Sequence, residues 1–336
     1  MRSVQISLRQ VAERAGVSDA TVSRVLNNAN VRIAEETRRR ITSIAKEMGY
    51  QPNRAARALA TGRTQTIAFW SANLRSQYYT QLISLSREEI VKHDYDLMIG
   101  TTNDAVDGVL DTSKLMSWPV DAFLTVDLPR AVIPGLSASL LWGKPFVNMG
   151  GYVYTDVDYV RLDFSRQSLV AAKHLVEVGC KRVAYLVPDW FDWYRSIDDD
   201  RLHGYELAMA DAGRQPEFIL TSNELRSTVD GALKPYILKN GAPDGLFCYN
   251  DDMAIGAYRA LRDLGLRIPE DVALVGCDGI EDTEYLDPPI TTIIAPFHEM
   301  CATAWSLLEK RIHDPSISLQ QVSLEARFCI RGSSIR

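Results

Sequence analysis

One short segment near the amino end, residues 18–28, restricts the fold most. It reads Ser-Asp-Ala-Thr-Val-Ser-Arg-Val-Leu-Asn-Asn and follows a helical run over Leu8–Ala15 and a turn at Gly16. Apolar residues recur at helical spacing on both sides of the turn, so two short helices can pack together. Gly16 suits the tight turn between two crossing helices. The segment therefore predicts a helix-turn-helix.

The second helix of this pair has a face of short, polar or basic side chains. Such side chains could approach base edges and phosphates in a major groove. An ordinary helical hairpin with a solvated polar face gives the same pattern, because a bare motif of this kind has false positives. The face comprises Ser18, Asp19, Ala20, Thr21, Ser23, Arg24 and Asn27.

The residues that follow favour DNA binding over that alternative. A third helix is expected over residues 35–48, although Ala34 is a poor residue to cap its start. The stretch Gly49-Tyr50, Pro52-Asn53, Ala56 and Leu59-Ala60 comes next. With Val11-Ala12, Ala15-Gly16-Val17-Ser18 and Thr21-Val22-Ser23-Arg24-Val25-Leu26-Asn27, it resembles the lactose/galactose repressor family.

The resemblance is dense over the first 62 residues and thinner toward the carboxyl end. It implies a dimeric regulator that binds double-stranded operator DNA and whose DNA affinity is set by a small ligand. It also implies further DNA contacts outside the second helix. These are Tyr50, Asn53, Arg54, Ala56 and Leu59.

Residues 53–61 are rich in Ala and Arg, with Pro52 before them and Gly62 after them, which predicts a short helix. A helix this short is marginal alone in water. In the family, the corresponding hinge helix enters the minor groove, where the residue at the position of Leu59 wedges between base pairs. The alternative is a flexible linker.

Charge separates the amino end from the remainder of the chain. Residues 1–63 hold 12 Lys or Arg and 5 Asp or Glu, a net charge of +7, whereas all 336 residues together carry −6. A basic head on an acidic body suggests that only the head meets a polyanion. The five cysteines are expected to be buried free thiols in a reducing cytoplasm, and no signal peptide or membrane span is expected.

From residue 64 onward, short apolar runs alternate with helical patterns, which predicts parallel sheets. The fold class is therefore α/β: an all-α helix-turn-helix head, 1–51, a hinge, 52–63, and a core, 64–336. The resemblance implies a periplasmic-binding-protein-like core of two α/β subdomains. The first would hold about 64–163 and 291–323, and the second about 164–290 and 324–336.

Ligand-binding candidates lie at expected strand ends, where clefts form in such sheets. Arg201 matches the effector-binding arginine of the family, and its planar fork can grip two adjacent oxygens. A surface ion pair with a neighbouring aspartate is its alternative role. Tyr79 could instead pack in the core, and Asp163 is the weakest candidate. The set is Tyr79, Asp163, Trp190, Trp193, Arg201, Asn250 and Asp278.

Two tryptophans beside polar side chains favour a sugar, whose apolar face stacks while its hydroxyls form hydrogen bonds. A nucleoside or purine could stack in the same way. A solute-binding module without operator function is a further alternative. No catalytic signature, phosphate-binding loop or zinc-ligand spacing is present, so an enzyme, a cofactor and a metal are not expected.

Overall fold

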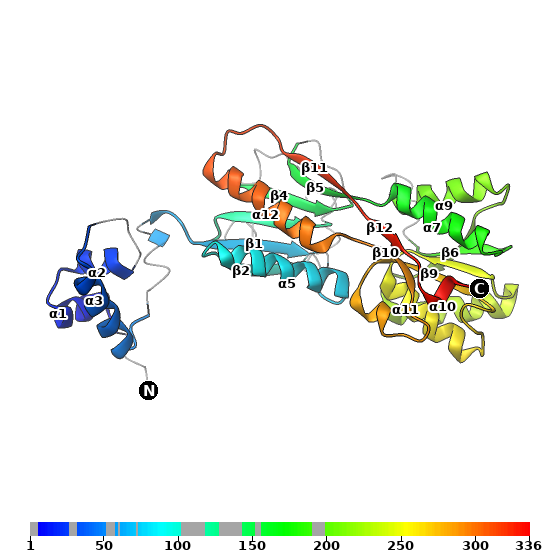
Figure 1. Ribbon diagram of the computed structural model, residues 1–336, viewed down its shortest axis with the longest axis horizontal. Coiled ribbons are helices and arrows are strands. Elements are labelled where there is room, and N and C mark those ends of the chain that lie inside the picture. Colours follow the sequence, from blue (N-terminus) through cyan, green and yellow to red (C-terminus); the bar gives the residue numbers. More distant parts are fainter. Residues whose placement is uncertain are drawn as a thin grey trace. The chain divides into compact units, whose positions relative to one another are not determined.

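A computed structural model describes residues 6–26, 32–51, 58–59, 61–71, 73–101, 118–127, 143–151, 156–189 and 199–336. The chain divides into two compact units, Met1–Gln65 and Thr66–Arg336 (Figure 1). Each unit has a hydrophobic core of its own. The units are described separately below.

The first unit is a bundle of three helices, α1 (Leu8–Ala15), α2 (Asp19–Leu26) and α3 (Glu35–Glu47), which confirms the predicted helix-turn-helix. Ser7 and Gln10 form a reciprocal capping box at the start of α1, and Gly16 ends this helix with φ +65°. Ala34 gives α3 no side-chain cap, as expected. The buried residues are Val11, Ala12, Ala15, Val22, Val25, Ile41 and Ala45.

The second unit contains two six-stranded sheets. The first has the order β11-β5-β4-β3-β1-β2 and is parallel throughout. Its strands are β1 (Thr66–Ser71), β2 (Asp96–Thr101), β3 (Ala122–Val126), β4 (Phe146–Gly150), β5 (Asp158–Asp163) and β11 (Gln321–Glu325).

The second sheet has the order β12-β10-β9-β8-β6-β7 and is parallel except for β12, which pairs antiparallel with β10. Its strands are β6 (Val183–Pro188), β7 (Glu217–Thr221), β8 (Gly245–Cys248), β9 (Ala273–Asp278), β10 (Thr291–Ile294) and β12 (Arg327–Cys329). The fold class predicted from the sequence, a helical head followed in the chain by two α/β subdomains, is confirmed.

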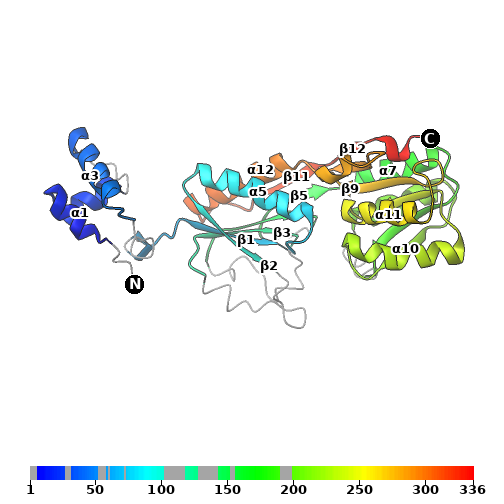
Figure 2. The same ribbon diagram turned by 90° about the horizontal axis from the view of Figure 1, so that it is seen from below.

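Helices α5 (Gln77–Lys92) and α12 (Phe297–His313) pack together on one face of the first sheet (Figure 2). Helices α7 (Ser165–Glu177) and α9 (Asp200–Asp211) form one pair on the second sheet, and α10 (Arg226–Asn240) and α11 (Asp251–Asp263) form another. Two 3-10 turns, η3 (Glu281–Glu284) and η4 (Gly332–Ser334), complete this part. Gly204 lets α9 approach α7, because a Cβ there would lie 2.7 Å from the Leu169 nitrogen.

The chain passes between the two sheets three times. The first passage falls between β5 and α7, next to Asp163. The second corrects a boundary drawn at residue 290: β10 pairs with β9, so residues 291–294 belong to the second subdomain and the passage follows Ile294. The third lies between β11 and β12, at Ala326. Periodicity could not separate these cases, because a buried strand looks alike in either sheet.

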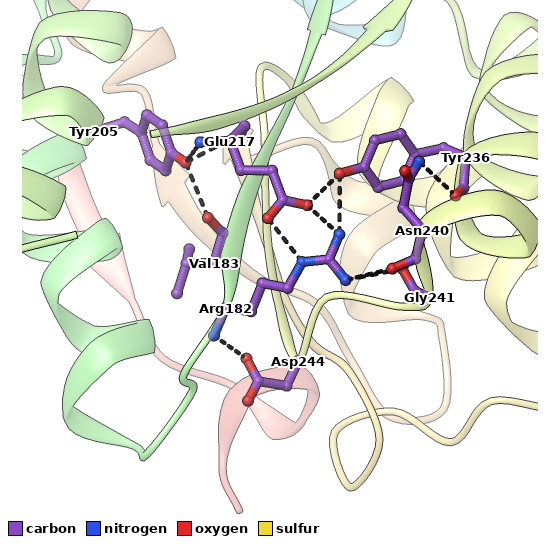
Figure 3. A network of polar contacts seen from close by, with 8 residues as sticks. All are labelled: Arg182, Val183, Tyr205, Glu217, Tyr236, Asn240, Gly241 and Asp244. Atoms are coloured by element: carbon purple, nitrogen blue, oxygen red, sulfur yellow. Dashed lines mark hydrogen bonds and ion pairs between the residues drawn. The ribbon is translucent and has the colours of Figure 1, made fainter. Parts of the chain in front are cut away.

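A polar network joins the amino ends of three strands in the second sheet (Figure 3). Arg182 donates two hydrogen bonds of 2.8 Å to Glu217, and it also donates to the carbonyl oxygens of Asn240 and Gly241. Tyr236 donates to the same glutamate from α10. This network holds the amino ends of these strands together. The polar residues described in the next section lie at the other, carboxyl ends.

Four of the five cysteines are buried and Cys329 is partly exposed; all five are free thiols. None of the described helices has both the length and the apolar character needed to cross a membrane.

Candidate functional site

The polar face of α2 is presented to solvent. Asp19, Ala20 and Arg24 are exposed, whereas the apolar side of the helix packs on α1 and α3. The hydroxyl of Ser18 accepts from the Thr21 amide at 3.2 Å, so Ser18 caps the helix. Arg24 forms no ion pair with any described residue and is available for an external anion. Ser23 is half-buried on the same helix, and Asn27 lies outside the described residues.

Leu59 is 88% exposed, which is unusual for a side chain of this size. The Gly62 amide donates to the Ala58 carbonyl at 2.8 Å and closes a helical turn there. Tyr50 packs against the apolar core of the head, and burial raises its pKa. The remaining candidates of this segment, Asn53, Arg54 and Ala56, lie outside the described residues.

In the second unit, Arg201 lies at the start of α9 and its side chain is only 14% exposed. Its Nη2 lies 3.0 Å from Asp199 Oδ2 and 2.5 Å from the Tyr249 hydroxyl, and its guanidinium lies over the Tyr249 ring. Burial would lower the pKa of Arg201, but Asp199 and its other neighbours raise it well above its ordinary value. The Arg201 guanidinium is therefore a buried cation whose position is fixed by Asp199 and Tyr249, and it does not lie on the surface as an exposed ion pair.

Three further carboxyl groups are close enough to Arg201 for its charge to lower their pKa, and we call Asp127, Glu224 and Asp278 the carboxylate cluster. Each follows or ends a parallel strand: Asp127 comes after β3, Glu224 after β7, and Asp278 ends β9. The Arg201 charge lowers the pKa of all three carboxyl groups, and the Asp127 charge raises the pKa of Glu224 and of Asp278. The cluster therefore draws on both sheets at their carboxyl ends, where ligands bind in such folds.

Burial dominates the electrostatics of this cluster. It raises the pKa of Asp127 to about 6 and that of Glu224 to about 7, and it raises the pKa of Asp278 well above its usual range. Hydrogen bonds act the other way: the Gly151 amide donates to Asp127 at 2.8 Å, and Asn73 donates to Glu224 at 3.0 Å. The second of these bonds joins the two subdomains.

Tyr78 contacts one of these carboxyl groups directly. Its hydroxyl hydrogen-bonds to Asp127, and its pKa is raised by burial and by Asp127 and Asp278. Tyr78 and Tyr79 are 5% and 8% exposed, both belong to the apolar core, and their rings lie edge-on at 5.1 Å. Of the two, Tyr78 is the one whose hydroxyl is shown to reach the carboxylate cluster.

Two other candidates use their side chains inside the protein. The Asn250 amide oxygen accepts from the Met253 amide at 2.8 Å as the cap of α11, and its nitrogen donates to the Glu224 carbonyl at 3.2 Å. The Asp163 carboxylate accepts from the backbone and hydroxyl of Ser165. Trp190 and Trp193 lie outside the described residues.

Sequence reasoning missed Asp127, Glu224 and Tyr78. The signal for Asp127 was present, because it directly follows a strand that the apolar pattern predicts. The signal for Glu224 was weaker, since it lies three residues beyond β7, a half-exposed edge strand whose apolar run is only three residues long.

Two family models match this chain. Residues 7–53 match the model described as bacterial regulatory proteins, lacI family, and residues 172–334 match the periplasmic binding protein-like domain. The first covers the helix-turn-helix, and the second covers nearly all of the second sheet. The chain belongs to the lacI family of bacterial regulatory proteins.

Relatives of this lacI-family chain match it along nearly its whole length. The ribose operon repressor of Haemophilus influenzae is 28% identical and spans 97% of this chain and 98% of its own length. The HTH-type transcriptional repressor PurR of Vibrio vulnificus is also 28% identical, with the same coverage. Among solved structures, the transcriptional regulator CelR in complex with cellobiose is 25% identical, with a TM-score of 0.65, and covers 98% of this chain and 100% of its own.

Membership of the lacI family assigns a role to each unit. The head binds DNA, the core responds to a small ligand, and the chain is a transcription regulator and not an enzyme.

Proposed function

We propose that this regulator binds a palindromic operator as a homodimer and that a sugar bound in its core changes its DNA affinity. The observation that carries the proposal is that the carboxylate cluster follows or ends strands of both subdomains, which the hydrogen bond from Asn73 to Glu224 joins, and that the charge of Arg201 acts on all three of its members. A polyhydroxyl compound offers both donors and acceptors to such a set of charged groups.

Known relatives support a sugar effector. The names of two of them specify ribose and cellobiose. Arg201 can donate to two adjacent hydroxyl oxygens, while Asp278 and Asp127 can accept from others. Trp190, Trp193 and Tyr79 remain proposed contacts from the sequence, as do Asn250 and Asp163. We also place this regulator in the cytoplasm, where its DNA lies.

The head provides the operator contacts in this proposal. The exposed Asp19, Ala20 and Arg24 would meet base edges in the major groove, and the half-buried Ser23 and Thr21 would lie beside them. Arg24, with a planar fork and no ion pair to a described residue, is the strongest candidate for a base contact. A second head related by two-fold symmetry would meet the other half of a palindromic site.

Ligand binding and operator binding are coupled if the ligand binds one arrangement of the two subdomains more tightly than another. A ligand shifts an equilibrium only through its different affinities for the two states. A ligand that contacts Asp127 on the first subdomain and Arg201 or Asp278 on the second satisfies this condition.

A thermal-shift screen of the full chain against sugars and nucleosides tests the ligand, because a ligand of the folded state raises its apparent stability. Each hit is then titrated into an operator complex. Arg201→Ala should weaken ligand binding by about 2 kcal/mol or more, since buried polar groups lose their partner. The Arg201→Ala variant should still bind operator DNA, but the ligand should no longer change its operator affinity.

Arg259→Ala is the matched control, because Arg259 has a 79% exposed side chain on α11 and only a local ion pair. It should respond to the ligand as the wild type does. Unchanged ligand affinity in Arg201→Ala would remove this residue from the site. Hits restricted to nucleosides would replace sugar as the ligand class, and failure to bind any duplex would favour a solute-binding module.

A further inference from the structure

A hydrogen bond joins the two subdomains at a place where the chain itself does not. Asn73 Nδ2 donates to Glu224 Oε1 at 3.0 Å, so the loop after β1 is bonded to the loop after β7. Both side chains are half-buried. The bond therefore connects segments that are far apart in the sequence and belong to different sheets.

This bond lies on the opposite side of the proposed ligand site from the chain passages. The passages leave from β5, β10 and β11, and Figure 1 shows β11 running on into β12. In the sheet orders, β11 and β5 form one edge of the first sheet, and β12 and β10 form one edge of the second. The strand β1 lies next to the other edge of its sheet, and β7 is the other edge of the second sheet. We call this side of the proposed ligand site its open side.

The loop after β1 is held in shape by its own hydrogen bonds. The Ser71 hydroxyl donates to the Asn73 carbonyl oxygen at 2.7 Å, and Asn73 Oδ1 accepts from the amides of Arg75 and Ser76 at 2.9 and 3.0 Å. An asparagine that bonds in this way to amides ahead of it fixes a turn. The side-chain oxygen of Asn73 is thus used inside its own loop, and the side-chain nitrogen reaches the other subdomain.

The loop after β7 repeats this construction. The Thr221 hydroxyl donates to the Asn223 carbonyl oxygen at 2.7 Å, and Asn223 Oδ1 accepts from the Leu225 amide at 2.9 Å. Asn250 adds a hydrogen bond of 3.2 Å to the Glu224 carbonyl oxygen. The Glu224 backbone is therefore held as well, and its carboxylate meets Asn73.

Two loops held in this way make the bond between them stronger than an ordinary surface contact. A surface pair usually contributes little, because two long side chains lose freedom when they meet. The Asn73 amide group is already oriented by its turn, so little further freedom is lost when it bonds to Glu224. The bond can therefore hold the two subdomains together on the open side.

The position of the bond also gives it control over opening. Three strand spacings separate β1 from β5 in the first sheet, so the bond has a lever of about 14 Å from the passages. A rotation of about 10° about the passages would part Asn73 and Glu224 by about 2 Å, which is enough to break the bond. The ion pair of Arg161 with Asp200, 2.8 Å long and only two residues from the passage at Asp163, would move far less.

We propose that Asn73 and Glu224 form a clasp that holds the two subdomains in the arrangement seen here before any ligand binds. Opening the clasp is then the step that lets the subdomains rotate apart and admits a ligand. This inference goes beyond the proposed function, because it concerns the resting state of the core and does not depend on which ligand the core binds.

Distances between spin labels test the clasp without ligand or DNA. Labels at Lys92→Cys in α5 and Lys239→Cys in α10 report on the open side of the two subdomains. Cys329→Ser removes the partly exposed thiol, and the four buried cysteines should stay unlabelled. The labelled full chain is mixed with an excess of unlabelled chain, so that only distances within one chain are measured. With the clasp intact, one narrow distance distribution is expected at pH 8.

Two substitutions open the clasp. At pH 8, Asn73→Asp keeps the oxygen that accepts from the Arg75 and Ser76 amides but places a carboxylate against Glu224, and Glu224→Ala removes the acceptor. Each should raise the population of a second distance about tenfold, as expected for the loss of a hydrogen bond to a charged group. Glu224→Gln keeps an oxygen that accepts from Asn73 and should keep the narrow distribution.

Two matched controls leave the clasp intact. Asn223→Asp makes the same chemical change in the second loop, where the side-chain oxygen caps its own turn. Arg166→Ala breaks an exposed ion pair that joins the subdomains beside the passages, with Arg166 and Glu325 3.8 Å apart and their side chains 77% and 70% exposed. Both variants should retain the single narrow distribution.

A wild-type chain that shows both distances in comparable amounts overturns the clasp. Asn73→Asp and Glu224→Ala variants that fold and give the wild-type distribution overturn it as well. Operator affinity without ligand is a separate readout: Asn73→Asp should change it, and Asn223→Asp should not. If the label distances change in Asn73→Asp while operator affinity stays constant, the clasp stands and the coupling in the proposed function fails.

Discussion

Neutralising Glu224 should remove part of the pH dependence of folding. Burial raises the pKa of this carboxyl from 4.5 to about 7. The folded state therefore holds a proton that the unfolded state has released, so the free energy of unfolding falls as pH rises from 4.5 through 7. Each pK unit is worth about 1.4 kcal/mol, so the fully ionised group costs the folded state about 3 kcal/mol. Between pH 6 and pH 8 the loss from this residue should be about 1 kcal/mol.

Urea unfolding of wild type and Glu224→Gln at pH 6, 7 and 8 measures this effect. The free energy of unfolding of the variant should fall less over this range, by about 1 kcal/mol, while the amide oxygen of the introduced glutamine still accepts from Asn73. Glu270→Gln removes an exposed carboxylate and should follow the wild-type curve. If Glu224→Gln and wild type lose the same stability between pH 6 and pH 8, Glu224 is not held in its protonated form and the reasoning fails.

Three further changes test the head, the hinge and the core. Arg24→Ala should weaken specific operator binding by about 1–3 kcal/mol in a mobility-shift assay; an equal loss on random DNA would mean that it contacts only phosphate. Leu59→Ala should weaken operator binding but leave the urea midpoint of the core unchanged, because this side chain is 88% exposed. Gly204→Ala should destabilise the core by about 1–3 kcal/mol, whereas Gly231→Ala, which faces open space on α10, should not; equal effects would contradict the close approach of α7 and α9.

Local rules predict the head well. The helix α1 begins at a capping box and ends at a glycine with positive φ, and both signals are readable in the sequence. Its apolar residues are few and recur strictly at helical spacing, so one arrangement buries them all. The missing cap at Ala34 was equally predictable, and α3 still begins at Glu35 because its apolar face packs on α1 and α2.

Most strands in the middle of the sheets were predictable, although β5 and β10 were not, and of the four edge strands only β2 was. A central strand such as β3 is buried along its whole length and gives a continuous apolar run. The edge strand β7 mixes buried and exposed residues, and β11 has no buried residue at all. Their positions depend on pairing partners far away in the sequence, which periodicity does not encode.

Site residues were predictable where the strands that carry them were predictable. Arg201 and Asp278 were found because they lie beside elements that the pattern predicts, and the structure brings them together. Glu224 was missed because its strand was missed. Asn250 was selected by its place at a strand end, yet that same place makes it the cap of α11, so position alone could not separate a ligand contact from a cap.

The strand β1 connects the head, along the chain, with the neighbourhood of the proposed ligand site. Its amino end continues from the head through residues 61–65, and its carboxyl end leads within two residues to Asn73. Asn73 donates to Glu224, a member of the carboxylate cluster on the other subdomain. A ligand that recruits Glu224 competes with this bond, so it acts on the far end of the strand that carries the head. The strand β1 is buried along nearly its whole length and is paired with a strand on each side. Because close packing makes such a strand stiff, we expect a shift at its carboxyl end to move its amino end as well.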